Sequence, residues 1–295
     1  MTNAAVPLTH PDKALYPTGF TKRDVADFYR SIAPVLLVHL RDRPLTLKRY
    51  PNGVQAPFFY EKECPKRHPP GIRAVALWSA HRNAPLPYCT ATDEEGLAWL
   101  ANLANIELHT TLSRGCAPDC PTSVVFDLDP GAPADVIDCA RVALQIRDLL
   151  AGVDLETLVK TSGSKGLQVY APLNTPTTFA DTKPFAHAVA ALLAKRDPDR
   201  VVAHMSRALR HGKIFIDWSQ NDPHKTTVSA YSLRALTWPS VSTPLAWREV
   251  EHAARLDRGD LLRFDSAAVQ RRIARHGDLF ADHARLHQTL PRGPA

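Results

Sequence analysis

The sequence has 295 residues, of which 44% are hydrophobic and 22% are charged, so it can bury a large core and is typical of a globular protein. Lysine and arginine number 36 against 30 aspartates and glutamates, and the resulting formal charge of +6 favours a polyanionic partner. Neither a signal-like start nor a run of roughly 18 apolar residues is present, which argues against a membrane or secreted protein and predicts a cytoplasmic one.

The cysteines are five in number and irregularly spaced: Cys64, Cys89, Cys116, Cys120 and Cys139. An odd, irregular set in a cytosolic chain does not predict a disulfide framework, so we expect reduced thiols. The spacing of Cys116 and Cys120, with His109 shortly before them, resembles half of a zinc site. Structural zinc sites show two close pairs of ligands, so we do not expect zinc here.

The first helix is predicted to start at Thr21, which with Asp24 gives a cap-like start before apolar residues at helical spacing. Pro34 should end or kink this helix. Residues 43–60 alternate and contain turn residues, which predicts strands joined by a turn.

Basic and aromatic side chains are interleaved between residues 48 and 62. Phosphates pair with Lys and Arg, and bases stack on aromatic rings, so this mixture favours a nucleic-acid or nucleotide surface. The residues that would form it are Lys48, Arg49, Phe59, Tyr60 and Lys62. The alternative is that the phenylalanines belong to the core and the charges form a solvated rim.

A capping box of Thr92 and Glu95 predicts a helix that runs toward Glu107, with His109 directly after it. His109 at this point is consistent with a contact to a phosphate or sugar. A histidine at a helix end also caps backbone carbonyls, which is the alternative.

Two carboxylates, Asp127 and Asp129, lie in the apolar segment 123–131. Residues two apart in a strand share a face, so both acids should point to one side. A second apolar strand, 213–218, carries Asp217. Like charges at short range repel, and hard divalent ions prefer carboxylate oxygens, so the three acids predict a site for two Mg²⁺ or Mn²⁺ ions. The alternative is that the acids only cap the next turn and helix.

Between the acidic strands lies a loop rich in small residues, Ser162-Gly163-Ser164-Lys165-Gly166, with strands predicted on both sides. Backbone N–H groups, hydroxyls and a lysine charge suit a triphosphate, so Ser162, Ser164 and Lys165 are predicted to bind a nucleotide. By itself the segment is equally typical of a plain turn. Its position between the acidic strands favours the phosphate hypothesis.

The later elements also alternate. In chain order we predict a helix from Pro133 to near Leu150, strands at 158–160 and 167–171, a helix through 185–193, a polar loop at 219–225, a strand-like segment at 226–233 and charged helices after Trp247. No linker interrupts them. We therefore expect one α+β domain over residues 1–285 and a frayed tail at 286–295.

Six ordered motifs resemble a known family: Leu8-Thr-His-Pro-Asp-Lys13, Arg43-Pro-Leu-Thr-Leu-Lys48-Arg49-Tyr-Pro-Asn-Gly53, Trp99-Leu-Ala-Asn-Leu-Ala-Asn-Ile-Glu-Leu-His109, Phe126-Asp127-Leu-Asp129-Pro-Gly131, Ser162-Gly-Ser-Lys165-Gly and Asp217-Trp-Ser-Gln220-Asn. In this order they are similar to the polymerase domain of bacterial ligase D, a member of the archaeo-eukaryotic primase superfamily. The similarity extends over roughly residues 8–250.

The resemblance implies a single primase-polymerase domain with an RRM-like catalytic palm and flanking mixed α/β elements. It also implies residue roles. Asp127, Asp129 and Asp217 would bind metal; Ser162, Lys165 and His109 would contact the phosphates and sugar; Lys48, Arg210, Gln220 and Arg234 would line the nucleotide pocket; Phe59 and Tyr60 would lie near base and template; Lys13 and Lys22 would hold the 5′-phosphate of a gap.

The expected activity is that of a stand-alone, metal-dependent, template-directed nucleotidyltransferase for gapped or broken DNA that prefers ribonucleotides. Its implied partners are NTP or dNTP, DNA with a 5′-phosphate, Ku and a separate DNA ligase. Gln168 departs from the family pattern, which has a histidine there. Two alternatives stay open: a non-catalytic module that binds DNA ends, and a phosphatase with an Asp nucleophile.

Overall fold

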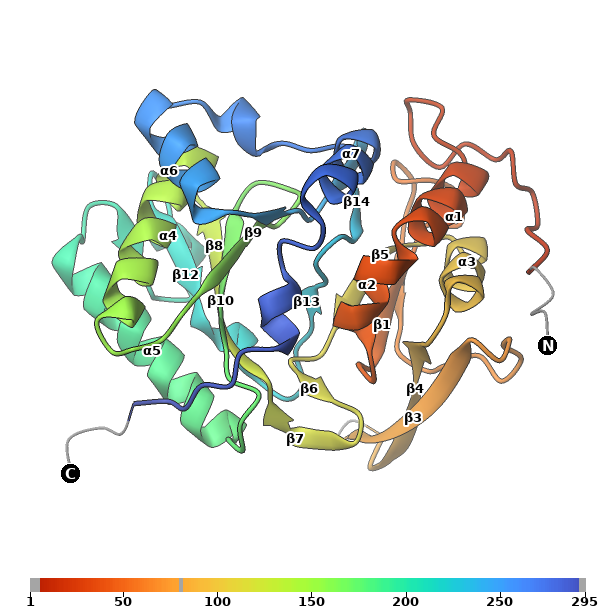
Figure 1. The fold of residues 1–295 in the computed structure, drawn as a ribbon, viewed down its shortest axis with the longest axis horizontal. Helices are drawn as coiled ribbons and strands as arrows, with labels where there is room; N and C mark the ends of the chain where they lie inside the picture. The colour runs from red at the N-terminus through yellow and green to blue at the C-terminus, as the bar shows by residue number, and fades with distance from the viewer. Residues whose placement is uncertain (1–5, 80–81, 292–295) are drawn as a thin grey trace. The chain divides into compact units, whose positions relative to one another are not determined.

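The computed structural model describes residues 6–79 and 82–291 (Figure 1). The chain divides into two compact units, each formed from three stretches. Unit 1 comprises Met1–Pro118, Thr226–Ser242 and Phe264–Asp278, and unit 2 comprises Asp119–Lys225, Thr243–Arg263 and Leu279–Ala295. Within the described ranges, no helix is long and apolar enough to cross a bilayer.

Unit 1 contains a sheet with the strand order β13-β5-β1-β4-β3, in which β2 also pairs with β1. The strands of unit 1 are β1 (Leu45–Arg49), β2 (Phe59–Glu61), β3 (Ile72–Ser79), β4 (Ala84–Ala91), β5 (Asn105–Thr110), β6 (Ser113–Arg114), β13 (Thr227–Val228), β14 (Leu233–Ala235) and β15 (Pro239–Val241). Of these, β14 and β15 form a separate two-stranded sheet. Its helices are α1 (Lys22–Ser31), α2 (Ala33–Leu40), α3 (Glu94–Asn102) and α7 (Ser266–His276). β7 (Ala117–Pro121) pairs with β6 where the chain leaves unit 1.

The first helical region follows its sequence signals. Thr21 and Asp24 form the predicted capping box of α1, with the Asp24 N–H donating to Thr21 Oγ1 at 3.2 Å. Pro34 lies in the first turn of α2, where its missing N–H costs no hydrogen bond, so α2 starts as a separate helix. The predicted strand pair also forms, since β1 and β2 are antiparallel neighbours.

The next helix differs from the expectation. Its N-cap is Asp93, which accepts from the Gly96 N–H at 2.8 Å, whereas Glu95 pairs with Arg30 at 3.2 Å. The helix ends at Asn102, and the left-handed Ala104 (φ 56) turns the chain into β5. The predicted extension toward Glu107 is therefore wrong, because these residues continue as a strand of the sheet.

A disulfide joins Cys64, just after β2, to Cys89 in β4, with their Cα atoms 4.8 Å apart. The expectation of reduced thiols is wrong for this pair, because the fold brings together two buried cysteines that are 25 residues apart in sequence. The free cysteines are Cys116, Cys120 and Cys139.

Unit 2 contains a sheet with the order β11-β12-β8-β10-β9-β16. Its strands are β8 (Ser123–Pro130), β9 (Leu158–Thr161), β10 (Leu167–Pro172), β11 (Val201–Val202), β12 (Ile214–Asp217) and β16 (Pro244–Leu245). Its α-helices are α4 (Val136–Ala151), α5 (Phe179–Arg196) and α6 (Trp247–Leu256), and its 3₁₀ turns are η1 (Arg207–Leu209), η2 (Trp218–Gln220), η3 (Gly259–Leu262) and η4 (Ala281–Ala284).

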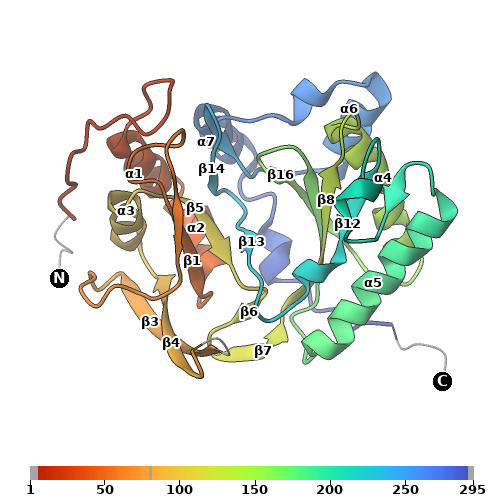
Figure 2. The same ribbon diagram turned by 180° about the vertical axis from the view of Figure 1, so that it is seen from behind.

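The succession β8-α4-β9-β10-α5-β12, with β8 and β10 adjacent in the middle, is the βαββαβ arrangement of an RRM-like fold. Both views place α4 and α5 on one side of this sheet (Figures 1 and 2). Phe126 and Leu128 of β8 are fully buried, as predicted for side chains that point away from the acids. The palm expected from the sequence is therefore present in unit 2.

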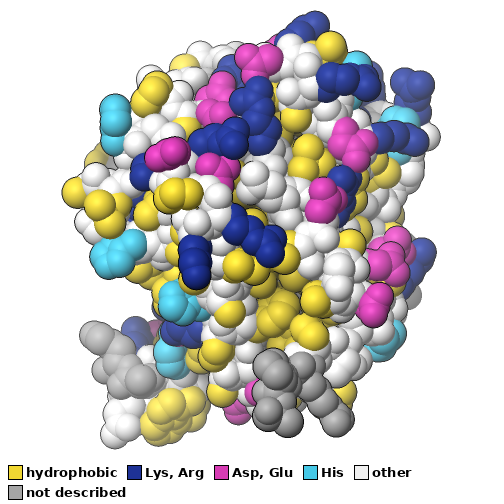
Figure 3. All heavy atoms as spheres, turned by 90° about the vertical axis from the view of Figure 1, so that its left-hand side faces the viewer, with side chains coloured by type: hydrophobic (Ala, Val, Ile, Leu, Met, Phe, Trp, Pro, Cys, Tyr) yellow, Lys and Arg dark blue, Asp and Glu magenta, His cyan; other side chains and the backbone are white. Residues whose placement is uncertain are grey.

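The helical side of unit 2 carries mixed charge. Figure 3 shows lysine and arginine side chains there interspersed with aspartate and glutamate. Arg147 of α4 pairs with Glu251 of α6 at 2.5 Å, and Arg141 pairs with Asp257 at 2.6 Å. This side therefore offers no continuous basic surface within the described residues.

Two further expectations need correction. Residues 226–233 form β13 and the start of β14 rather than one strand, because Tyr231 between them is left-handed (φ 65). The frayed tail also begins later than residue 286. The backbone N–H of Gln288 donates to the Leu173 carbonyl at 2.8 Å, and its side chain donates to the Pro172 carbonyl at 2.6 Å. Residues 292–295 of that predicted tail lie outside the described residues.

Candidate functional site

A row of polar side chains crosses four strands of the unit 2 sheet. Asp217 of β12 pairs directly with Asp127 of β8, Asp127 with Gln168 of β10, and Gln168 with Lys160 of β9. Directly paired residues of antiparallel strands place their side chains on the same face. Asp129, two residues beyond Asp127, points to that face as well. The sheet thus brings the three predicted acids together.

Asp127 has an unusual electrostatic environment. Burial, together with the negative charges of Asp129 and Asp217, raises its pKa to about 7. A hydrogen bond from the Gln168 side chain and the charge of Lys160 act in the opposite direction. Asp127 therefore lies in an environment that disfavours its charged form.

Sequence reasoning missed Lys160, which lies behind this row. Its side chain is completely buried, and Nζ donates to Gln168 Oε1 at 2.6 Å. Because that oxygen is occupied by the lysine, the amide nitrogen of Gln168 remains for Asp127. Gln168 thus links a buried cation to the acids. A lysine in an apolar strand was the signal available in the sequence.

Asp217 is held by its own loop. It accepts hydrogen bonds from the Ser219 N–H at 3.0 Å and from Gln220 Nε2 at 3.0 Å, and Lys225 donates to the Ser219 hydroxyl. Gln220 was predicted to line the nucleotide pocket. In the structure its side chain donates to Asp217, and its role in a nucleotide pocket stays a prediction.

The three acids fit a divalent cation by their donor chemistry, since carboxylate oxygens are the ligands that Mg²⁺ and Mn²⁺ prefer. In the part of the chain that the structure describes, however, no three His, Cys, Asp or Glu side chains converge closely enough to hold a metal ion.

The predicted phosphate loop is a tight turn on the unit 2 sheet. Ser162 Oγ accepts from the N–H groups of Ser164 and Gly166, both at 3.2 Å, and Gly163 has a φ of +70. A Cβ on Gly166 would lie 1.8 Å from the Leu128 carbonyl, so only glycine lets the loop approach β8. Lys165 is exposed and forms no hydrogen bond or ion pair among the described residues. The loop therefore presents one available cation beside the acidic strand.

Arg210 also belongs to this group. Its guanidinium lies 3.6 Å from the centre of the Phe215 ring, and Phe215 pairs across the sheet with Asp129. Its NH2 group donates to the Met205 carbonyl at 2.8 Å. Unit 2 thus contributes the acids, Gln220, Arg210 and the loop from the predicted set.

In unit 1 a second charged group, the Glu107 cluster, contains three other predicted residues. Glu107 is 2% exposed and lies 3.3 Å from Lys48 Nζ, 2.8 Å from His109 Nε2 and 3.3 Å from Arg234 Nε. The Tyr50 hydroxyl and the Ala235 N–H also donate to its carboxylate, at 3.3 and 3.1 Å. One buried carboxylate therefore connects β1, β5 and β14.

The charges of this cluster balance each other. Burial alone would raise the pKa of Glu107, but the hydrogen bond with His109 and the charges of Arg234 and Lys48 hold it below its usual range. Burial lowers the pKa of His109, against the effect of Glu107. Glu107 was missed as a site residue, although a Glu two residues from a His on a strand predicts side chains on the same face.

The predicted DNA-binding aromatics are exposed: Phe59 by 45% and Tyr60 by 58%. Arg49 lies 5.2 Å from the Phe59 ring centre, donates to Glu61 at 2.8 Å and to the Leu103 carbonyl at 2.9 Å. Lys62 is exposed. Phe59 therefore does not belong to the core, which removes the alternative given for it.

Lys13 and Lys22 differ from each other. Lys13 is exposed, donates to Asn52 at 3.1 Å and borders a cavity of about 460 Å³ with His10, Pro11 and Asp12. Lys22 is buried and donates to the carbonyls of Thr9 and Asn102, at 2.7 and 3.1 Å. Burial, and then the charges of Lys13 and Arg49, lower the pKa of Lys22. Only Lys13 is thus open to a ligand, in a region that Lys22 makes more positive.

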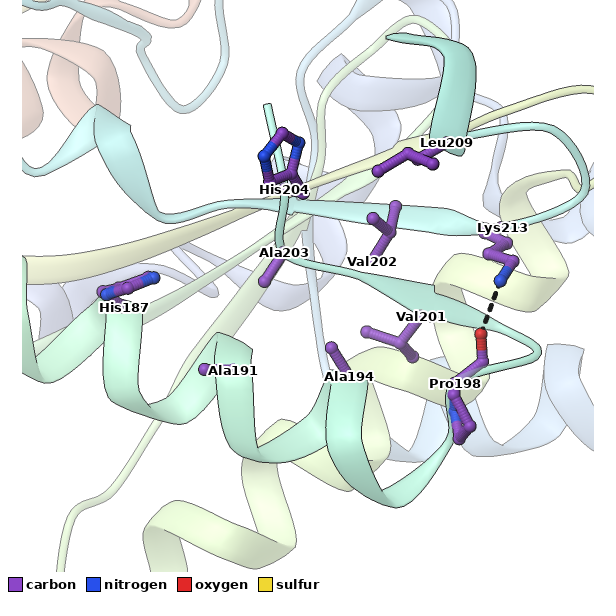
Figure 4. Close-up of a pocket in the computed structure, with 10 residues that line it drawn as sticks. All are labelled: His187, Ala191, Ala194, Pro198, Val201, Val202, Ala203, His204, Leu209 and Lys213. Carbon is purple, nitrogen blue, oxygen red and sulfur yellow. Dashed lines mark hydrogen bonds between the residues drawn. The ribbon is translucent and has the colours of Figure 1, made fainter. Parts of the chain in front are cut away.

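A separate pocket of about 450 Å³ lies between α5 and β11 (Figure 4). Its lining is mostly apolar, with His187, His204 and Lys213 as the polar members. Lys213 donates to the Pro198 carbonyl at 2.6 Å, and His187 packs against Trp218 with ring centres 4.3 Å apart and ring planes inclined by 43°. None of the predicted site residues lines this pocket.

Comparison with known proteins gives consistent results. The family model described as "LigD, primase-polymerase domain" matches residues 21–280. The chain is 42% identical over 283 residues to the multifunctional non-homologous end joining DNA repair protein LigD of Mycobacterium tuberculosis, covering 93% of this chain and 36% of the relative. It is 31% identical over 252 residues to LigD of Pseudomonas aeruginosa, covering 84% of this chain and 29% of that protein. The chain thus spans about a third of the length of these relatives.

A solved structure is also similar. The polymerase domain from Mycobacterium tuberculosis ligase D in complex with DNA matches with a TM-score of 0.87 and 40% identity. The match covers 95% of this chain and 98% of that one.

Proposed function

The chain belongs to the LigD primase-polymerase family, and from this premise we propose that it is a DNA repair nucleotidyltransferase that fills gaps and extends broken ends. The proposal includes a template-directed reaction, a requirement for Mn²⁺ or Mg²⁺ and a preference for ribonucleotides. The observation that carries it is the acid row of unit 2, with the Lys165 loop beside it.

In this proposal Asp127, Asp129 and Asp217 hold the divalent cations. When bound, such ions lower the pKa of the attacking 3′-hydroxyl and stabilise the charge on the phosphoryl oxygens. Gln168 and Gln220 keep two of the acids in place through the hydrogen bonds described above. The chain's own work is to position the reacting groups.

The remaining predicted residues bind substrates in the proposal. Lys165, Ser164 and Arg210 contact the triphosphate, for which exposed cations and N–H groups are suited. Lys48, His109 and Arg234 contact other parts of the nucleotide. Lys13 binds the 5′-phosphate of a gap, and Phe59, Tyr60 and Lys62 contact DNA. Ku and a separate ligase are the partners proposed for the cell.

The test is primer extension on a one-nucleotide gap with and without a 5′-phosphate, run with Mn²⁺, Mg²⁺ or EDTA and with NTP or dNTP. We expect incorporation that needs a divalent ion, follows the template base, and disappears in Asp129→Asn but not in the exposed control Asp148→Asn. DNA binding without incorporation would favour the end-binding module instead. Release of phosphate from small phosphoesters without templated incorporation would favour the phosphatase.

A further inference from the structure

Lys160 of β9 is a lysine without access to solvent. It is 0% exposed, although lysine is among the residues that are least often buried in proteins. Gln168 of β10 pairs with it on one side and Pro244 of β16 on the other, so it is held inside the unit 2 sheet. A buried ammonium group costs free energy unless hydrogen bonds compensate for it. The partners of Lys160 therefore indicate what it does.

Lys160 determines the orientation of the Gln168 amide. A glutamine amide can take two orientations, since its oxygen accepts and its nitrogen donates. Lys160 Nζ donates to Gln168 Oε1 at 2.6 Å, and the Tyr170 hydroxyl donates to the same oxygen at 3.3 Å. A lysine ammonium has no lone pair, so the reversed amide would place two donors against each other. Lys160 thus turns the amide oxygen toward β9.

The same orientation decides which amide atom Asp127 meets. Asp127 pairs directly with Gln168 across β8 and β10, and the Gln168 side chain donates a hydrogen bond to it. In the reversed orientation an amide oxygen would face the carboxylate, and two acceptors cannot form a hydrogen bond. An ionised carboxylate has about four acceptor positions, so one N–H donor leaves the others for a cation. A fixed donor on one side therefore orients the carboxylate without filling it.

The charge of Lys160 is the alternative explanation of its place beside the acids. A nearby positive charge stabilises the ionised form of Asp127, but it also repels a divalent cation. The hydrogen bond to Gln168, in contrast, acts only through the orientation of the amide. The first effect requires a charge at position 160, whereas the second requires a donor group there. Substitutions that keep one property and remove the other can therefore separate them.

We propose that Lys160 is a positioning residue, which fixes the amide of Gln168 so that its NH₂ group faces Asp127 and orients that carboxylate for a divalent cation. This rests on the proposed function, in which Asp127 holds such a cation. In this proposal Lys160 contacts neither the cation nor the substrate and acts through Gln168. The three residues belong to adjacent strands of the unit 2 sheet, so the arrangement depends on that unit alone.

The orientation of the amide can be measured in the metal-free protein. In ¹H–¹⁵N spectra of protein labelled on glutamine, the side-chain signals lost in Gln168→Met identify Gln168. We expect one of its N–H protons to resonate downfield of those of the exposed Gln55 and to exchange with water more slowly. Asp127→Asn replaces the carboxylate by a weaker, neutral acceptor and should move this signal upfield. A Gln168 amide that exchanges like Gln55, or that Asp127→Asn leaves unmoved, would overturn the proposal.

Two substitutions of Lys160 separate its hydrogen bond from its charge. Lys160→Met and Lys160→Gln both remove the charge, but only the glutamine can donate to Gln168 Oε1. Electron paramagnetic resonance of free Mn²⁺, without nucleotide, gives the affinity of each variant. We expect Lys160→Met to bind Mn²⁺ about threefold to tenfold more weakly than Lys160→Gln, which is the effect of one hydrogen bond. Equal affinities, or tighter binding by Lys160→Met, would assign Lys160 to charge balance and overturn the proposal.

The matched control is the pair Lys195→Met and Lys195→Gln, since Lys195 of α5 is exposed. Both should bind Mn²⁺ as the unmutated protein does. Circular dichroism and melting curves show whether the Lys160 variants fold. If they do not fold, the amide spectrum of the unmutated protein still decides which way Gln168 faces.

The outcomes separate this inference from the proposed function. If the unmutated protein incorporates nucleotides on gapped DNA but the two Lys160 variants bind Mn²⁺ equally, the positioning role is wrong and the function stands. If the variants differ as expected but no nucleotide is incorporated with either metal, the function is wrong and the positioning role stands. Absence of Mn²⁺ binding to the unmutated protein would overturn the positioning role, whatever the amide spectrum shows.

Discussion

Asp127 in unit 2 and Glu107 in unit 1 are both carboxylates on strands, but the charges around them have opposite signs. Burial and the neighbouring acids raise the pKa of Asp127 to about 7, whereas three nitrogen groups hold that of Glu107 below its usual range. A carboxylate whose partners all belong to the chain holds other residues in place. A group of acids with too few cations is completed by a ligand. The comparison therefore separates a structural anchor from the proposed cation site.

The largest expected effect is that of Asp127→Asn, which tests the cation-site half of the comparison. Templated incorporation should fall at least about a hundredfold, because the substitution removes one of the three carboxylates proposed to bind the divalent cations. The metal-free protein should melt at the same or a higher temperature, since the substitution removes a repelling charge. Single-turnover extension and thermal melting measure the two effects. Extension near that of the control Asp148→Asn would remove Asp127 from the site.

The next prediction tests whether Glu107 is a structural anchor. Glu107→Gln leaves Lys48 and Arg234 close together without their carboxylate, so the free energy of unfolding should fall by about 3 kcal/mol. For Glu95→Gln we expect about 1 kcal/mol or less. Urea unfolding monitored by circular dichroism compares the two variants. Equal losses would show that the Glu107 cluster is an ordinary ion pair.

The same comparison can be made between two lysines. Lys165 of unit 2 is exposed, whereas Lys48 of unit 1 forms an ion pair with Glu107. If Lys165 binds the triphosphate, Lys165→Ala removes a charged hydrogen bond of about 1.5–3 kcal/mol and raises the nucleotide KM roughly ten- to hundredfold. Steady-state kinetics with varied NTP measures this. An unchanged KM would identify the loop as a plain turn.

The two carboxylates should also differ in pH dependence. The pKa of Asp127 is higher in the folded protein, about 7, than the ordinary aspartate value of 3.8, so its contribution to stability is complete below about pH 4 and is lost as the pH rises through 7. About 3 pH units separate the two pKa values and each unit corresponds to about 1.4 kcal/mol, so without metal we expect a loss of up to about 4 kcal/mol across this window. Melting curves from pH 4.5 to 8 measure it, and Mn²⁺ should suppress it. An identical decline in Asp127→Asn would assign it to other groups.

The smallest expected effect is that of substituting Lys13, an exposed cation of unit 1. Lys13→Ala should reduce the stimulation of gap filling by a 5′-phosphate about threefold to tenfold and spare extension on open template-primer. Lys22→Ala should in addition lower stability, because its ammonium bonds the carbonyls of Thr9 and Asn102. Gap-filling rates with and without the phosphate measure the effect. Equal rates on both gaps in the unmutated protein would contradict it.

Short sequence patterns correctly predicted those features of the fold that depend only on residues close together in the chain. The β8 acids, the α1 cap and the turn at Ser162 follow from side-chain period and turn chemistry. The pairing of Asp127 with Gln168, and of Gln168 with Lys160, depends on strand register, which a single strand does not specify. Arg234 reaches Glu107 from 127 residues further along the chain, and Cys64 reaches Cys89 across two strands. Such contacts belong to the tertiary fold, and therefore the sequence pattern missed them.

The interleaving of the two units has a consequence for how the chain is made. It passes between the units after Pro118, Lys225, Ser242, Arg263 and Asp278. A ribosome that adds about 5–20 residues per second has therefore completed neither unit until synthesis reaches α7. No single cut of the gene yields either unit whole. Neither unit can therefore complete its fold before the chain has been synthesised beyond Arg263.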